Sequence, residues 1–180
     1  MKYTFLLSAL CSVFGVWSAQ AQSLTLVELT GIGAGHVSEE WPAAKVARVV
    51  PFAGWTYQGV LNNTHEHYWT YREPGAPATD TPEGTVSLIS SPQGNDVVLK
   101  TSSGACVRRL RHELQEQKLE PVPVAGLDCT GVRYTTRNYS LSIYNKKTGP
   151  YPHVVVVRVT PQPMLVGNDL GTGRTPASPE

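Results

Sequence analysis

Two histidines stand two residues apart in the segment His65-Glu66-His67. On a β-strand, residues two apart project from the same face, so both imidazole rings could contact one metal ion. Zinc accepts histidine nitrogens at about 2.0–2.1 Å, and a working site needs a third or fourth ligand. The chain offers His36, His112, His153 and several carboxylates, and no spacing selects one of them. The pair thus predicts part of a divalent metal site, for example for zinc; the alternative is a pair of hydrogen-bonded or solvated histidines on a half-exposed strand.

The spacing from Gly59 to His65 and His67 is similar to the opening of the first cupin motif. Cupins are barrel proteins whose metal site uses two histidines, a glutamate and a later histidine. The resemblance implies a small metal-dependent enzyme with a cupin-like barrel and with His65 and His67 as ligands. It stops after this segment, because Glu73 comes one residue later than the usual glutamate and the second cupin motif is absent.

Aromatic residues lie around the two histidines and indicate a second kind of site. Flat amphipathic rings supply much contact area at a low entropic cost, so they could stack on a carbohydrate or contact a protein. The competing role of such rings is to fill the core. Tyr68 and Trp69 should face opposite ways, since neighbouring residues of a strand alternate. The candidate binding residues are Trp55, Tyr57, Tyr68, Trp69 and Tyr71.

The first residues predict an exported protein. Lys2 is followed by an uncharged apolar run over residues 3–17, and the segment ends in Ala19-Gln20-Ala21, a pattern that signal peptidase accepts. The run is shorter than the roughly 20 residues that cross a bilayer. We therefore expect residues 1–21 to be a cleavable signal peptide, and the mature chain to be secreted or periplasmic and to have no membrane span.

Cleavage after residue 21 changes both the net charge and the cysteine count. Removal of Lys2 leaves 14 of the 15 basic residues against 14 acidic ones. A formally neutral chain gives no electrostatic reason to expect nucleic acid as a partner. Cys11 is removed as well, so Cys106 and Cys129 remain. An even number of cysteines in an exported chain predicts a disulfide between them.

Most of the mature chain consists of short segments of alternating polarity, separated by clusters rich in glycine and proline. This pattern predicts strands rather than helices. The glycine-rich segment 31–35 predicts a loop, and it lacks the lysine and serine or threonine of a phosphate-binding loop. The run of valines from residue 154 predicts a strand buried on both faces. The predicted strands are residues 24–30, 45–50, 55–61, 66–71, 85–90, 96–101, 132–144 and 153–160.

Residues 106–119 fit either a helix or a strand. In a helix, Val107, Leu110 and Leu114 share one side. However, the arginines at its start and the glutamates at its end oppose the helix dipole. In a strand, Leu110 and His112 share a face, and the flanking segments are themselves predicted strands. The two interpretations are nearly balanced, and the strand is slightly favoured.

The predicted fold is mainly β: a single small antiparallel β-sandwich or β-barrel domain over residues 22–160, with 106–119 as its one candidate helix and one disulfide. The 159 residues left after cleavage are enough for one hydrophobic core. Residues 161–180 carry little apolar surface after Val166, so we expect a disordered tail.

The sequence leaves three functions open. It contains neither a phosphate loop nor the nucleophile elbow of a serine hydrolase. We therefore favour a secreted or periplasmic, non-catalytic binding protein of the inhibitor, immunity or effector type. Such a protein would recognise a protein or glycan partner and needs no cofactor. The alternatives are the metal-dependent enzyme with the cupin-like barrel and a structural domain associated with the cell envelope.

Overall fold

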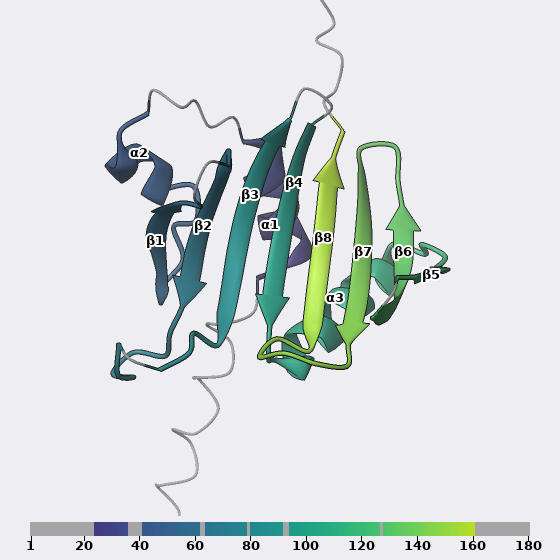
Figure 1. Ribbon diagram of the computed structural model, residues 1–180. Helices are drawn as coiled ribbons and strands as arrows, with labels where there is room; N and C mark the ends of the chain where they lie inside the picture. Colours follow the sequence, from purple (N-terminus) through teal and green to yellow (C-terminus); the bar gives the residue numbers. More distant parts are fainter. Residues whose placement is uncertain are drawn as a thin grey trace, which may run out of the picture.

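The computed structural model describes residues 24–35, 41–61, 64–78, 80–91, 94–126 and 128–160. The predicted signal peptide and the predicted disordered tail lie outside these residues. Within them, one open, eight-stranded antiparallel sheet is accompanied by three helices (Figure 1). The elements are α1 (Leu26–Ala34), α2 (Ala43–Ala47), β1 (Trp55–Val60), β2 (Glu66–Tyr71), β3 (Gly84–Ser91), β4 (Gly94–Thr101), α3 (Gly104–Glu116), β5 (Val122–Ala125), β6 (Cys129–Thr135), β7 (Tyr139–Lys146) and β8 (His153–Val159).

Two meanders of four strands meet at the centre of the sheet. The strand order is β1-β2-β3-β4-β8-β7-β6-β5. After β4, the chain passes through α3 to the far edge, and β5 to β8 then return until β8 pairs with β4. Val97 and Leu99 of β4 stand opposite Val157 and Val155 of β8. Valine-rich β8 is therefore an interior strand of the sheet.

The predicted sandwich or barrel is wrong, because helices rather than a second sheet cover one face. In Figure 1, α1 and α3 lie behind the sheet, and the front carries no helix over its central strands. Two of the segments that supply this layer, 24–30 and 106–119, were predicted or favoured as strands. A strand over residues 45–50 is also wrong, since Ala43–Ala47 form α2, which begins after Pro42.

The other predicted strands are confirmed within a few residues. Residues 132–144 are divided into β6 and β7 by a turn in which the hydroxyl of Thr136 accepts hydrogen bonds from the amides of Asn138 and Tyr139. The short edge strand β5 has no counterpart in the prediction. It contains Pro123, which suits an edge position because proline has no amide hydrogen to donate to a neighbouring strand.

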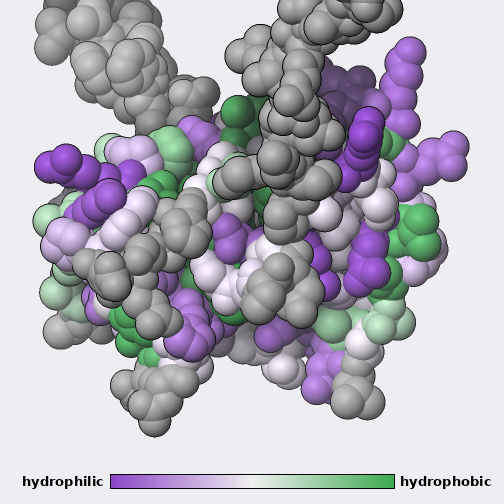
Figure 2. Space-filling view, turned by 90° about the horizontal axis from the view of Figure 1, so that it is seen from above, coloured by the Kyte–Doolittle hydropathy of each residue, from purple (hydrophilic) through white to green (hydrophobic). Residues whose placement is uncertain are grey.

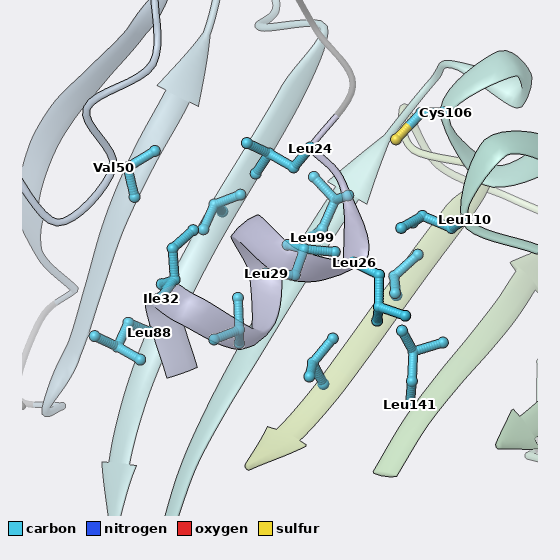
Figure 3. Close-up of a cluster of buried hydrophobic side chains, with 14 of the residues drawn as sticks. Leu24, Leu26, Leu29, Ile32, Val50, Leu88, Leu99, Cys106, Leu110 and Leu141 are labelled. Carbon is cyan, nitrogen blue, oxygen red and sulfur yellow. The ribbon is translucent and has the colours of Figure 1, made fainter. Parts of the chain in front are cut away.

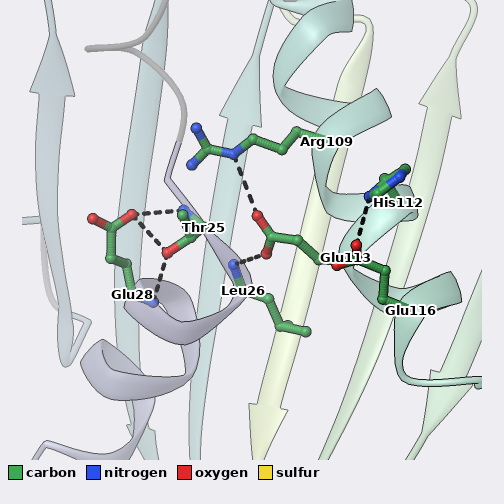
Figure 4. A network of polar contacts seen from close by, with 7 residues as sticks. All are labelled: Thr25, Leu26, Glu28, Arg109, His112, Glu113 and Glu116. Carbon is green, nitrogen blue, oxygen red and sulfur yellow. Dashed lines mark hydrogen bonds and ion pairs between the residues drawn. The ribbon is translucent and has the colours of Figure 1, made fainter.

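α1 begins with a capping box. The hydroxyl oxygen of Thr25 accepts a hydrogen bond from the Glu28 amide at 3.1 Å, and the Thr25 amide donates to the Glu28 carboxylate at 2.6 Å (Figure 4). This arrangement satisfies amide groups that a helix start otherwise leaves without partners. Leu26, Leu29 and Ile32 of the helix are buried against the sheet. The prediction of a strand here is wrong because a segment as short as residues 24–30 does not show whether its apolar residues repeat with the period of a strand or of a helix.

The glycines predicted to form a loop continue α1 and bring it close to the sheet. A β-carbon at Gly33 would lie 2.6 Å from Cγ2 of Val159 and 3.2 Å from Cγ2 of Val97, so only glycine fits this contact without a shift. The Asn95 side chain of β4 donates hydrogen bonds to the carbonyl oxygens of Gly33 and Gly35 at the end of the helix. Gly33 thus sets the distance between α1 and strands β4 and β8.

Most of the ambiguous segment 106–119 belongs to the helix α3. The Ser103 hydroxyl accepts a hydrogen bond from the Cys106 amide at 3.2 Å and caps the helix start. One side of α3 is buried. On the other side, Nδ1 of His112 lies 3.5 Å from a carboxylate oxygen of Glu116. The carboxylate of Glu113 contacts Arg109 at 3.3 Å and accepts a hydrogen bond from the Leu26 amide at 2.7 Å (Figure 4). Glu113 therefore stabilises the start of α1, where the helix dipole favours a negative charge.

The hydrophobic core lies between these two helices and one face of the sheet (Figure 3). It unites side chains from both meanders, since Leu88 and Leu99 belong to the first and Leu141 to the second. Core residues labelled in Figure 3 include Leu24, Leu26, Leu29, Ile32, Val50, Leu88, Leu99, Leu110 and Leu141.

Hydrophilic and hydrophobic residues are interspersed on the end of the molecule seen in Figure 2. No helix among the described residues is long and apolar enough to cross a membrane.

The predicted disulfide is wrong, because both Cys106 and Cys129 are free. Cys106 lies on the buried side of α3 and is fully enclosed by the core. Cys129 is half-buried and begins β6, where it pairs with Lys146 of β7. Burial raises the pKa of the Cys106 thiol to about 11. The even cysteine count indicated a bridge, but the two residues belong to different elements, α3 and β6, and neither forms a disulfide.

This arrangement predicts unequal reactivity of the two thiols. A thiol with a pKa of about 11 is ionised in only about one molecule in a thousand at pH 8, and the thiolate is the reactive form. We expect iodoacetamide to alkylate Cys129 in the folded mature protein and Cys106 only after unfolding, as measured by peptide mass spectrometry. A cross-linked Cys106–Cys129 peptide in the unreduced protein would contradict the structure.

Candidate binding groove

The two faces of the sheet differ in composition. Residues that stand opposite one another in the register share a face, so each row of the sheet can be followed across the strands. The helix face includes the row Trp69, Val86, Leu99, Val155 and Ile143. We call the other side the open face; its central rows are Tyr68, Ser87, Val98, Val156 and Ser142, and Thr70, Thr85, Lys100, Val154 and Tyr144.

The connection between β7 and β8 folds over part of the open face. The Tyr151 hydroxyl donates a hydrogen bond to the carbonyl oxygen of Pro82 at 2.9 Å, which ties this connection to the segment before β3. Gly149 has a φ of +101°, a left-handed conformation that glycine adopts without strain. Burial raises the pKa of Tyr151, and the nearby Arg72 partly opposes that rise. Tyr151 therefore remains protonated at neutral pH and able to donate this bond.

A groove of about 350 Å³ lies between this connection and the sheet. Its floor is formed by residues that pair across neighbouring strands of the sheet. Tyr68 of β2 stands opposite Ser87 of β3, and Lys100 of β4 stands opposite both Thr85 of β3 and Val154 of β8. Leu61, next to the end of β1, contributes to the lining. The remaining lining residues, from β7 and the connection, are Lys146, Thr148, Gly149, Pro150 and Tyr151.

Among the residues that the structure describes, two lysines and no acidic residue line the groove. Lys100 is half-buried and Lys146 is exposed. The nearest acidic residue along β4 is Asp96. Nε and Nη2 of Arg158 in β8 donate hydrogen bonds to its two carboxylate oxygens at 2.7 and 2.6 Å. Glu66 lies one row beyond Tyr68 on the open face, outside the lining. The local charge of the groove is therefore positive although the mature chain is predicted to be neutral.

The structure does not bring His65 and His67 together with further metal ligands. His67 is buried on the helix face, where its Nδ1 atom lies 2.9 Å from the hydroxyl oxygen of Tyr57. His65 is exposed and precedes β2. Nδ1 of His153 lies 3.0 Å from the side-chain oxygen of Asn145. Among the residues that the structure describes, no group of three or more His, Cys, Asp and Glu could hold a metal ion. The metal site therefore stays a prediction that lacks a third ligand here.

The aromatic candidates are divided between the two faces. Trp55, Trp69 and Tyr71 are buried, and Tyr57 packs against Trp69 with the ring centroids 5.2 Å apart. Tyr68 faces the other way, as predicted from strand alternation, and lines the groove. The five rings do not form one platform, because alternation along β2 sends Trp69 and Tyr71 into the core. Only Tyr68 combines a predicted binding role with a place in the groove.

Sequence reasoning missed Tyr151, Lys100 and Lys146 as site residues. The turn-rich cluster around Gly149 and Pro150 indicated a connection but not that it folds back over the sheet. Lys100 and Lys146 come together only because β8 lies between β4 and β7. Such pairing of distant segments leaves no mark in the local pattern of either strand.

The chain matches no family model, no curated protein and no solved structure. Its groove must therefore be interpreted from its own geometry and chemistry.

Proposed function

We propose that the protein is an exported, non-catalytic binding protein that recognises a glycan through the groove on its open face. Export rests on the signal peptide predicted for residues 1–21. The observation that carries the binding function is a preformed groove that combines two tyrosines with several hydroxyl groups. This combination suits a sugar, whose ring can stack on an aromatic side chain while its hydroxyl groups exchange hydrogen bonds.

The size and position of the groove favour a glycan over a protein partner. Its volume of about 350 Å³ falls in the range of small-molecule sites, about 300–1,000 Å³. A protein interface of standard size instead buries about 800 Å² on each partner and is usually centred on exposed anchors. The aromatic residues that could serve as such anchors, Trp55 and Trp69, are buried in the core.

The sheet holds the groove in a fixed shape. Tyr68, Ser87 and Lys100 belong to adjacent strands that are hydrogen-bonded to one another. The hydroxyl of Tyr151 fixes the connection that forms the other wall. A preformed site loses little conformational freedom on binding, which leaves more of the contact energy for affinity.

Replacing Tyr68 by alanine is expected to weaken glycan binding about tenfold. Loss of one stacked ring costs roughly 1–1.5 kcal/mol, which corresponds to about one order of magnitude in Kd. The measurement is isothermal titration of the mature protein with a panel of soluble neutral and acidic oligosaccharides. Tyr144→Ala is the matched control, because Tyr144 is a half-buried tyrosine on the same face that does not line the groove. We expect it to change Kd less than twofold.

Two outcomes would contradict the proposed function. If no oligosaccharide of the panel binds at millimolar concentration, the protein is not a glycan-binding protein of this kind. If Tyr144→Ala weakens binding as much as Tyr68→Ala, the ligand does not lie in the groove. Unfolding midpoints of both variants show whether either substitution acts through stability.

A further inference from the structure

We infer that the groove selects acidic glycans and that Lys100 and Lys146 contact the negative charge of the ligand. This inference rests on the proposed function and adds the chemical class of the ligand. The sugar would carry a carboxylate or a sulfate group, either of which an ammonium group can bind as a point charge.

Lys100 lies in the floor of the groove, and none of the other described residues that line the groove is acidic. Its neighbours across the sheet, Thr85 and Val154, are uncharged. Among the described residues, no ion pair to its side chain is found, and the lining around it includes the ring of Tyr68 and the aliphatic side chain of Val154. An ammonium group in a groove whose described lining contains no acidic residue attracts an anionic ligand more than a neutral one.

Lys146 approaches the groove from the other side of β8. Its backbone amide donates a hydrogen bond to the Pro152 carbonyl oxygen at 2.8 Å, which fixes the base of the β7–β8 connection. Only β8 separates β4 from β7. Adjacent strands are about 4.8 Å apart, and Lys146 lies two residues beyond Tyr144, which shares the row of Lys100, so the two lysine backbones are roughly 12 Å apart. Two lysine side chains can meet one anionic group across such a distance.

The backbone of the floor favours a sugar over an acidic peptide. Peptides commonly bind to sheets by adding a strand to a free edge. β2, β3, β4 and β8 each have a neighbouring strand on both sides, so they have no free edge to offer. Binding to the floor must then proceed through side chains, and these include hydroxyl groups, two tyrosines and two lysines beside the aliphatic Leu61 and Val154.

The test compares charged oligosaccharides with neutral partners of the same backbone. Tetragalacturonate is compared with its methyl ester, and a sulfated carrageenan tetrasaccharide with its desulfated form, by isothermal titration of the mature protein in low salt. We expect at least one acidic member of these pairs to bind tenfold or more tightly than its neutral partner. The preference should decrease at 0.5 M salt, because exposed charges are screened.

Substitutions of the two lysines test whether these residues cause the preference for acidic oligosaccharides. We expect Lys100→Met and Lys146→Met each to weaken binding of the preferred acidic oligosaccharide about tenfold and to leave binding of its neutral partner within twofold. Lys147→Met is the matched control, because Lys147 is exposed, next in the chain and outside the lining. If Lys100→Met fails to fold, the exposed Lys146 carries the test, and Lys100→Arg, which keeps the charge, should retain the preference.

The outcomes separate this inference from the proposed function. Equal binding of acidic and neutral oligosaccharides, with a loss in Tyr68→Ala, overturns the inference and leaves the proposed function standing. Tighter binding of tetraglutamate than of either acidic sugar, dependent on the same lysines, overturns the inference in favour of an acidic peptide. Binding of no oligosaccharide overturns both.

Discussion

Replacing Gly33 by valine is expected to lower the free energy of unfolding by about 3 kcal/mol, which is the upper part of the usual cost of overpacking a core. A β-carbon at this position would lie 2.6 Å from Cγ2 of Val159, well inside van der Waals contact. Valine is stiff about its first side-chain torsion, so Val159 cannot easily move aside. The helix must then retreat from β4 and β8, and the contacts of Leu29 and Ile32 with the sheet are weakened. Urea unfolding followed by circular dichroism measures the effect.

Gly31→Val is the matched control for this substitution. Gly31 belongs to the same helix and is exposed, and a β-carbon there meets no atom within 4 Å. Valine has a somewhat higher helix propensity than glycine, so we expect Gly31→Val to change stability by less than about 0.5 kcal/mol. Equal effects of the two substitutions would show that α1 does not pack on the sheet through Gly33.

Replacing Leu110 by alanine is expected to lower the free energy of unfolding by about 2–5 kcal/mol, the usual cost of truncating a buried leucine. Leu110 is fully buried between α3 and the sheet. His112→Ala should change stability by less than about 0.5 kcal/mol, because His112 is exposed and its contact with Glu116 joins two solvated side chains. Chemical unfolding of the two variants measures both values.

This pair of substitutions also distinguishes the helix from the strand that the sequence slightly favoured. On a strand, Leu110 and His112 would share a face, and both substitutions would affect the same contacts. On α3 they lie on different sides. A large loss of stability in His112→Ala, comparable with that of Leu110→Ala, would contradict the helix.

Most of the strands were predictable, whereas the segments that form the helices were predicted or slightly favoured as strands, for a physical reason. In β3 and β4, apolar and polar residues alternate because one face meets the core and the other faces the groove. In α1, by contrast, 9 residues are too few to show a clear helical period, and the two glycines of the helix act against helix propensity. The close approach of Gly33 to Val159 compensates for that loss, and it depends on β8, more than a hundred residues away in the chain.

The charge pattern of α3 misled the sequence prediction because it was considered for one helix alone. Glutamates near the end of a helix oppose its own dipole. Glu113, however, accepts a hydrogen bond from Leu26 at the start of α1 and contacts Arg109. The local cost is therefore offset by a tertiary contact between the two helices, which no window of the sequence contains.

Only one residue of the candidate groove was predictable as a site residue. Tyr68 was identified as a candidate because it is aromatic, and strand alternation predicted that it faces the side of the sheet opposite to that of Trp69. Lys100, Lys146 and Tyr151 join it through the pairing of β4 with β8 and through the folded-back connection. Predicting them would have required the strand order, in which β8 inserts between β4 and β7.

The central claim is that the open face, at the groove, is where a glycan binds. The most direct measurement is nuclear magnetic resonance of the ¹⁵N-labelled mature protein during titration with the best-binding oligosaccharide of the panel. We predict that the largest amide shifts fall on Tyr68, Ser87, Lys100, Val154 and the connection that contains Tyr151. Shifts confined to α1, α3 or the edge strands β1 and β5, with the groove unchanged, would contradict it.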